Sequence, residues 1–394
     1  MKIMIVLFNN FLEKIGGAER GFANMANAFV RRGHLVTGVY NRIVTEPFVF
    51  PLDKRVKLYN VNTTGKKIKG SFLKKIVRET CKSLVNKGMV KDYYELEVEK
   101  KIAVPFQKII DKERPDFIIF YNEDGYAILK YLDIGKAKAC LKLNTGEASI
   151  NNLTSPRHKD IFSGLEKLSF IHVYLPYQKE LLAARIPEMK IVVIPNEVKL
   201  ASVNEQPRLP WIVMTSRMVR VKRPDLLIKA FRIAAAEVQG WELHLYGKFE
   251  EKAYKLELET LIASYNLQEK VFLEGPVTAV EKVLSKSGIF AFTSSVEGFG
   301  RSLAEAMQLG LPCVAAQDCP AAVCLLGAGK SGFLCNPDPA AFAAVLVKLM
   351  RDQNLRQKWG TLAQEAGRKY DPENIFTQWL EVISASVASE PGFK

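Results

Sequence analysis

Short apolar runs alternate with helical patterns along the first half of the chain. Runs of this kind, bounded by polar or turn-forming residues, predict buried strands. They lie at Ile3–Leu7, Leu35–Tyr40, Phe117–Tyr121, Ala139–Leu143, Phe170–Tyr174 and Ile191–Ile194. Because helical patterns such as Ala18–Val30 separate these runs, we expect a parallel, doubly wound sheet.

The alternation restarts after a polar segment, Leu200–Pro210, which contains two prolines. New strand-like runs lie at Ile212–Thr215, Leu243–Tyr246, Val271–Leu273, Ile289–Phe292 and Cys313–Ala315. The pattern predicts an α/β protein with two Rossmann-like domains in tandem, residues 1–198 and 199–370. An amphipathic helix that begins at Pro372 follows within residues 371–394.

The stretch from Ile289 to Ala315 joins a strand, a glycine loop and a helix. The first N–H groups of a helix attract anions, and Gly298 and Gly300 let a ligand approach the backbone closely. Glu297 in the loop and Glu305 in the helix could bind hydroxyl groups at the two ends of one ligand. The alternative is a surface helix with two solvated glutamates.

Two further loops offer contacts to a phosphate or a sugar. Arg217 and Lys222 belong to a basic cluster at the carboxyl end of a predicted strand, and together they could clamp a diphosphate. Gly16 and Gly17 open a helix after the first strand and could expose backbone amides to a ligand. Taken alone, the basic cluster is typical of a solvated loop, and the glycine pair is typical of a tight turn.

Composition narrows the classes of protein. The chain has 394 residues and is 48% hydrophobic, which suits two globular domains with real cores. It contains no apolar run of 18 residues, and its first apolar run is too short for a signal peptide. Six cysteines without a C-x-x-C pair indicate reduced thiols in a cytoplasm. The four histidines are scattered along the sequence, so the pattern offers few ligands for a zinc site.

The net charge of +14 is unevenly distributed. Residues 66–91 contain nine basic residues and one acidic residue, and apolar residues recur among them at helical spacing. A basic amphipathic helix is typical of an anionic membrane surface, but a solvated helix packed on its own domain is an equal alternative. No nucleic-acid motif accompanies the charge. The candidate membrane or acceptor surface comprises Lys66, Lys67, Lys74, Lys75, Arg78 and Lys82.

Together these motifs resemble the retaining glycosyltransferases of family 4 (group 1), which have the GT-B fold. The matching segments occur in family order over nearly the whole chain, and EGFGRSLAEAM is the most specific of them. They are Gly16–Arg20, Ile194–Asn196, Arg217 with Lys222, Leu245–Gly247, Val271–Gly275 and Glu297–Met307.

The resemblance implies two Rossmann-like domains facing a cleft, with the acceptor on the first and a nucleotide sugar on the second. It implies that Arg217 and Lys222 neutralise the diphosphate, that Glu297 contacts the donor sugar, and that Glu305 holds the ribose. It also implies that the C-terminal helix crosses back to the first domain and that no metal or other cofactor is required, in keeping with the absence of a D-x-D motif. The implied donor-binding residues are Gly16, Gly17, Arg217, Lys222, Glu297, Gly298, Phe299, Gly300, Arg301, Ser302, Leu303 and Glu305.

Three positions depart from the family pattern. Asn144 stands where many members carry a histidine near the sugar, so it is the candidate sugar contact at that place. The usual G-x-G reads Gly247-Lys248-Phe249, and the usual proline–glycine–glutamate loop reads Asp318 to Val323 without its glutamate.

The function implied is transfer of a hexose or N-acetylhexosamine from a nucleotide sugar to a membrane-associated glycan. UDP is the expected nucleotide because it is the most frequent one in the family. Such an acceptor would be a lipid-linked oligosaccharide or a precursor of lipopolysaccharide or capsule. We expect a cytoplasmic enzyme, peripheral at the inner face of the plasma membrane if the basic helix binds lipid, and no nucleic-acid partner. The alternatives are a glycosyltransferase with a soluble acceptor and a non-catalytic scaffold of the same fold.

Overall fold

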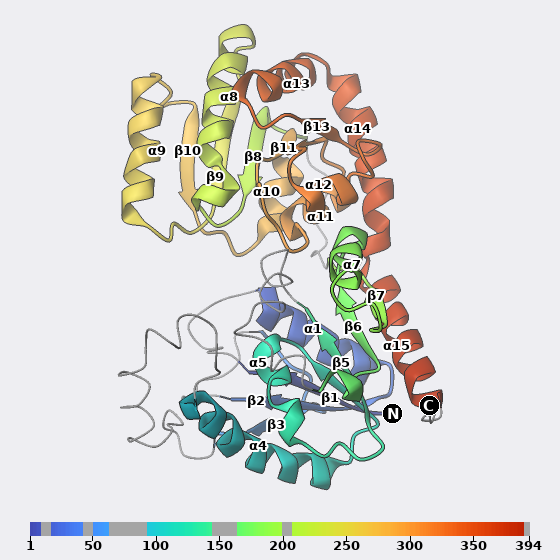
Figure 1. Ribbon diagram of the computed structural model, residues 1–394. Coiled ribbons are helices and arrows are strands. Elements are labelled where there is room, and N and C mark those ends of the chain that lie inside the picture. The colour runs from blue at the N-terminus through green and yellow to red at the C-terminus, as the bar shows by residue number, and fades with distance from the viewer. Residues whose placement is uncertain (9–16, 42–49, 63–92, 144–163, 199–206, 390–394) are drawn as a thin grey trace. The chain divides into compact units, whose positions relative to one another are not determined.

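The computed structural model describes residues 1–8, 17–41, 50–62, 93–143, 164–198 and 207–389 (Figure 1). Contacts group these residues into two units, Met1–Pro195 with Phe376–Lys394 and Asn196–Ile375. The assignment of acceptor and donor to separate domains stays a prediction. The following predicted site residues lie outside the described residues: Gly16, Lys66, Lys67, Lys74, Lys75, Arg78, Lys82 and Asn144.

The first unit is built on a seven-stranded parallel sheet in the order β3-β2-β1-β4-β5-β6-β7. In β1 (Lys2–Leu7) all residues but the first are buried, as expected for a central strand covered on both faces. The other elements are α1 (Gly17–Arg31), β2 (Leu35–Tyr40), β3 (Lys57–Asn60), α4 (Tyr93–Glu113), β4 (Phe117–Phe120), α5 (Glu123–Tyr126), β5 (Lys138–Lys142), β6 (Phe170–Val173), α7 (Pro176–Ala183) and β7 (Ile191–Val193).

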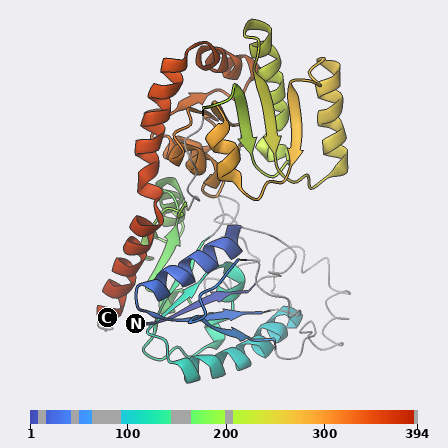
Figure 2. The ribbon, with the colours of Figure 1, turned by 180° about the vertical axis from the view of Figure 1, so that it is seen from behind.

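The C-terminal helix α15 (Pro372–Ala388) packs on this first unit. Trp379 is 1% exposed, and its ring lies 4.5 Å from the ring of His172 in β6. Phe376 meets Phe29 of α1 edge to face, with ring centroids 6.2 Å apart. Figure 2 shows the N-terminus beside this helix. The apolar face of the predicted C-terminal helix therefore completes the core of the first unit.

The second unit is a six-stranded parallel sheet in the order β10-β9-β8-β11-β12-β13. Both sheets are parallel throughout, as the alternating pattern predicted. The elements are β8 (Trp211–Thr215), α8 (Pro224–Glu237), β9 (Glu242–Tyr246), α9 (Lys252–Ser264), β10 (Val271–Gly275), α10 (Val280–Lys286), β11 (Ile289–Phe292), α11 (Arg301–Gln308), β12 (Cys313–Ala316), α12 (Pro320–Leu325), β13 (Phe333–Cys335), α13 (Pro339–Arg351) and α14 (Gln353–Gly367).

Helix α14 fixes the end of α11 through two close backbone approaches. A Cβ on Gly360 would lie 2.2 Å from the carbonyl oxygen of Gly310, and one on Gly367 would lie 3.0 Å from the backbone nitrogen of Gln308. Since only glycine permits such contact, α11 is held firmly at its carboxyl end. Its first turn, which follows the glycine loop, is left at the carboxyl edge of the sheet.

Within the described ranges, no helix combines the length and the low polarity needed to cross a bilayer.

Candidate functional site

The turn after β8 carries the predicted basic residues. Arg220–Lys222 form a 3₁₀ turn, and Arg223 takes a left-handed conformation with φ 51° before α8 begins with Pro224. Lys222 is largely withdrawn from solvent, with 9% of its side chain exposed. The loop after β11 runs beside this turn, and its Thr293 and Ser294 are fully buried.

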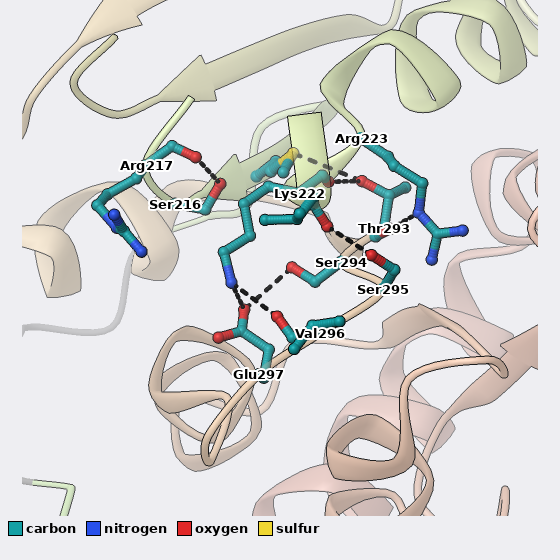
Figure 3. A network of polar contacts seen from close by, with 11 residues as sticks. Ser216, Arg217, Lys222, Arg223, Thr293, Ser294, Ser295, Val296 and Glu297 are labelled. Carbon is teal, nitrogen blue, oxygen red and sulfur yellow. Dashed lines mark hydrogen bonds and ion pairs between the residues drawn. The ribbon is translucent and has the colours of Figure 1, made fainter. Parts of the chain in front are cut away.

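Hydrogen bonds join the turn to the loop (Figure 3). The Thr293 hydroxyl donates to the carbonyl oxygen of Lys222 over 2.7 Å. Both the backbone N–H and the hydroxyl of Ser295 donate to the carbonyl oxygen of Val221, at 2.9 and 3.1 Å. These bonds connect segments some seventy residues apart, so the turn and the loop form one structural unit at the edge of the sheet.

Lys222 and Glu297 form an ion pair at the centre of this unit. The Lys222 Nζ lies 2.8 Å from Glu297 Oε1 and donates to the carbonyl oxygen of Val296 over 3.0 Å. The Ser294 hydroxyl donates to the same carboxylate oxygen over 3.0 Å. The side chains are 9% and 18% exposed, so each charge depends on the other, and removing one would leave its partner poorly solvated. The structure thus brings two of the three predicted catalytic residues into contact.

Arg217 lies apart from this pair. Its guanidinium is ion-paired with Glu250 at 2.5 Å, and the two side chains are 65% and 49% exposed. In Figure 3 the Arg217 side chain lies to one side of Lys222 and Glu297, with no contact to either. The predicted clamp of Arg217 with Lys222 is therefore not assembled in this structure.

Arg223 and Asp318 add a contact that the sequence reading missed. The Arg223 guanidinium donates to both carboxylate oxygens of Asp318, at 2.9 and 2.6 Å. Its Nε donates to the carbonyl oxygen of Thr293 over 2.7 Å. One side chain thus ties together the loops after β8, β11 and β12. Two features of the sequence could have pointed to these residues. Arg223 lies in the basic cluster, and Asp318 begins the loop that departs from the family pattern.

The first turn of α11 carries the backbone N–H groups that were predicted to bind an anion. Gly300 precedes it with φ 89°, a conformation that suits glycine. The Leu303 side chain is fully buried, so any contact of this residue with a ligand must come from its backbone. Arg301 reaches Glu197 at 3.3 Å, and Glu197 is a further buried residue that the sequence reading missed, although it directly follows the matched segment Ile194–Asn196.

Four of the remaining predicted donor residues lie in or beside α11. Gly298 and Ser302 flank the start of α11. Phe299 is 4% exposed and meets Tyr370 edge to face at 5.4 Å between ring centroids. Glu305 is 5% exposed inside α11. Gly17 opens α1 in the first unit.

Cys319, at the start of α12, lies in the electric field of the Lys222–Glu297 pair. Burial raises the pKa of the Cys319 thiol, the Glu297 carboxylate raises it as well, and Lys222 lowers it. The thiol therefore stays protonated at neutral pH. Across the described parts of the chain, no group of three or more His, Cys, Asp or Glu residues could hold a metal ion.

Comparison with solved structures places the fold. HepE of Anabaena in complex with UDP-glucose is 19% identical, with a TM-score of 0.72 over 98% of this chain and 100% of that one. A TarM mutant of S. aureus, solved with fondaparinux, α-GlcNAc-glycerol and UDP, is 18% identical, with a TM-score of 0.72 over 97% and 99%. Two parallel α/β domains with these neighbours define the GT-B fold.

Comparison of sequences identifies a family domain in the second unit. Residues 196–366 match the family model "Glycosyl transferases group 1". The chain is 28% identical over 230 residues to a poly(ribitol-phosphate) α-N-acetylglucosaminyltransferase of Staphylococcus aureus, covering 58% of this chain and 46% of that protein. It spans less than half the length of the first four curated relatives it matches, from 26% to 46%. The matched residues lie within the second unit, Asn196–Ile375, which therefore contains a group 1 glycosyltransferase domain.

Proposed function

We propose that the protein transfers a sugar from a nucleotide sugar to a glycan acceptor. The observation that carries the proposal is the Lys222–Glu297 pair beside the first turn of α11, inside the domain that matches the family. A positive charge, a helix start and a carboxylate are the groups that a diphosphate-linked sugar needs. The names of the relatives support polymeric acceptors, and the UDP complexes among the structural neighbours support UDP.

Lys222 is the group best placed to stabilise the leaving diphosphate. As the bond between the sugar and the phosphate breaks, negative charge grows on the phosphate oxygens, and a fixed ammonium favours that change. The Val296 carbonyl holds the Lys222 Nζ at 3.0 Å, so the charge is already in position before the donor binds. The first N–H groups of α11 add to the same stabilisation.

Glu297 is proposed to accept hydrogen bonds from the hydroxyl groups of the donor sugar, and Glu305 from the ribose. The Ser294 hydroxyl and the Lys222 ammonium hold the Glu297 carboxylate in position at the edge of the sheet. We further propose that transfer retains the anomeric configuration by front-face attack, in which the departing phosphate accepts the proton of the acceptor. This scheme requires neither a protein nucleophile nor a metal. A glycosyl adduct trapped on Glu297 would contradict it.

The sugar is proposed to be a hexose or N-acetylhexosamine, and the acceptor a membrane-associated glycan at the inner face of the plasma membrane. Flotation with vesicles tests the membrane part of this proposal. Binding to vesicles with anionic lipid, and not to neutral vesicles, is expected if the basic segment that includes Lys74 and Lys75 contacts the membrane. Equal recovery with both vesicle types would favour a soluble acceptor.

Thermal shift with UDP-, GDP- and ADP-sugars tests the donor assignment. A ligand that binds only the folded state at one hundred times its Kd adds about 2.7 kcal/mol of stability, so the correct nucleotide should raise the melting temperature clearly. The shift should be lost in Glu305→Gln and kept in Glu237→Gln, a surface control that removes a carboxylate paired with Arg351. No shift with any nucleotide sugar would refute the proposed function and favour the non-catalytic scaffold.

A further inference from the structure

Glu250 forms an ion pair with Arg217, one of the predicted donor-binding residues. The pair has a separation of 2.5 Å, and it stands at the carboxyl edge of β8 and β9, where doubly wound sheets bind ligands. Figure 3 shows Arg217 on the opposite side of Ser216 from the Lys222–Glu297 pair. The Glu250 carboxylate is therefore paired with Arg217, the residue that the family pattern assigns to the diphosphate.

The backbone places Glu250 beside Arg217. The Ser216 N–H donates to the carbonyl oxygen of Tyr246 over 2.9 Å, and the Met218 N–H donates to that of Lys248 over 2.9 Å. A Cβ on Gly247 would lie only 1.6 Å from the Ser216 carbonyl oxygen, so the two loops touch at that residue. Since these contacts fix the segment just before Glu250, its proximity to Arg217 is part of the fold.

The pair is nevertheless easily broken. Its side chains are 65% and 49% exposed, and ion pairs in water contribute at most about 1 kcal/mol. A diphosphate offers Arg217 more negative charge and a geometry that matches the guanidinium fork. Both long side chains can change rotamer without disturbing the loops that carry them.

We infer that Glu250 is an affinity-setting residue for the donor: it holds Arg217 in the ligand-free protein and is displaced by the diphosphate. The inference rests on the proposed function, since it concerns the same donor site. Donor binding must then break one ion pair to form another. Removal of the Glu250 charge should tighten binding, and it should do so only through Arg217.

The chain contains a matched control three residues further along the same turn. Arg220 is ion-paired with Glu257 of α9 at 2.6 Å, with side chains 61% and 51% exposed. Its guanidinium also lies over the ring of Tyr254, 4.6 Å from the centroid. Glu257→Gln therefore removes a carboxylate from an equally exposed arginine pair that belongs to no predicted donor contact.

The experiment is calorimetric titration of UDP into wild type, Glu250→Gln, Glu257→Gln, Arg217→Ala and the Arg217→Ala/Glu250→Gln double variant. Glu250→Gln should lower the Kd about two- to fivefold, the range that one exposed ion pair can supply. Glu257→Gln should leave the Kd unchanged. In the Arg217→Ala background, Glu250→Gln should have no effect, because the two changes act on one interaction.

If wild type binds UDP and Glu250→Gln binds equally or more weakly, the inference fails and the proposed function stands. The inference also fails if Glu250→Gln tightens binding without Arg217, because the effect is then general repulsion of an anion. If neither wild type nor any variant binds UDP or another nucleoside diphosphate, the proposed function fails with it.

Discussion

Arg223 should stabilise the site more than any other partly exposed side chain around it. Its Nε donates to the carbonyl oxygen of Thr293, a residue with no exposed surface, and the ion pair with Asp318 is 22% and 41% exposed. A hydrogen bond from a charged donor contributes about 1.5–3 kcal/mol, and the half-exposed pair contributes at most about 1 kcal/mol. Arg223→Ala should therefore lower the free energy of unfolding of the second unit by about 2–3 kcal/mol.

The backbone at this position gives a second, independent expectation. Arg223 has φ 51°, in the left-handed region that costs a non-glycine residue about 1–2 kcal/mol. Arg223→Gly loses the same contacts but relieves that strain, so it should be less destabilising than Arg223→Ala by about 1 kcal/mol.

Thermal unfolding of the whole protein measures both effects. For a unit of this size 1 kcal/mol corresponds to about 2–4 °C, so Arg223→Ala should melt roughly 5–10 °C below wild type, with Arg223→Gly between them. Asp318→Asn should shift the midpoint by only a few degrees. An Arg223→Ala variant that melts at the same temperature as wild type would refute the stabilising role of the Arg223 contacts. A glycine variant less stable than the alanine variant would refute the strain argument.

Two other expectations concern buried titratable groups. Burial holds the pKa of His172 well below its usual 6.5. As the pH falls below 6.5, the unfolded chain takes up a proton at this residue and the folded protein does not. The contribution of His172 to the free energy of unfolding should therefore be retained above pH 6.5 and decline below it. Between pH 7.5 and 5.5, wild type should lose about 1.4 kcal/mol more than His172→Gln in denaturant titrations, and equal losses would contradict a buried neutral imidazole. Burial also raises the pKa of the Cys335 thiol to about 11 and that of Cys313 further. Peptide mapping after iodoacetamide treatment at pH 8 should find both thiols unmodified until denaturant is added, and labelling in the native protein would show that they are accessible thiolates.

The strand pattern predicted the parallel sheets well because central strands are buried on both faces and read as continuous apolar runs. The two strands it missed, β3 and β13, are edge strands of four and three residues. In β3 the first two residues, Lys57 and Leu58, are exposed, so no buried run marks it. Short edge strands depend on a neighbouring strand, which a local pattern does not reveal.

The candidate site was predictable to the extent that residue types near strand ends identify it. Lys222 and Glu297 were both chosen from the sequence, and their contact follows from the neighbouring strands β8 and β11. The partners of Arg217 and Arg223 were not predictable in the same way. Glu250 and Asp318 belong to other loops, and only the packing of those loops determines which cation each carboxylate meets.

The central claim is that the Lys222–Glu297 unit binds a nucleoside diphosphate. Titration of UDP into Lys222→Met tests it directly, with Lys229→Met as control because Lys229 pairs with Asp225 on α8, outside the site. Loss of a charged contact to phosphate should weaken binding at least about tenfold in Lys222→Met, while Lys229→Met binds as wild type does. Equal affinity of wild type and Lys222→Met would contradict the account.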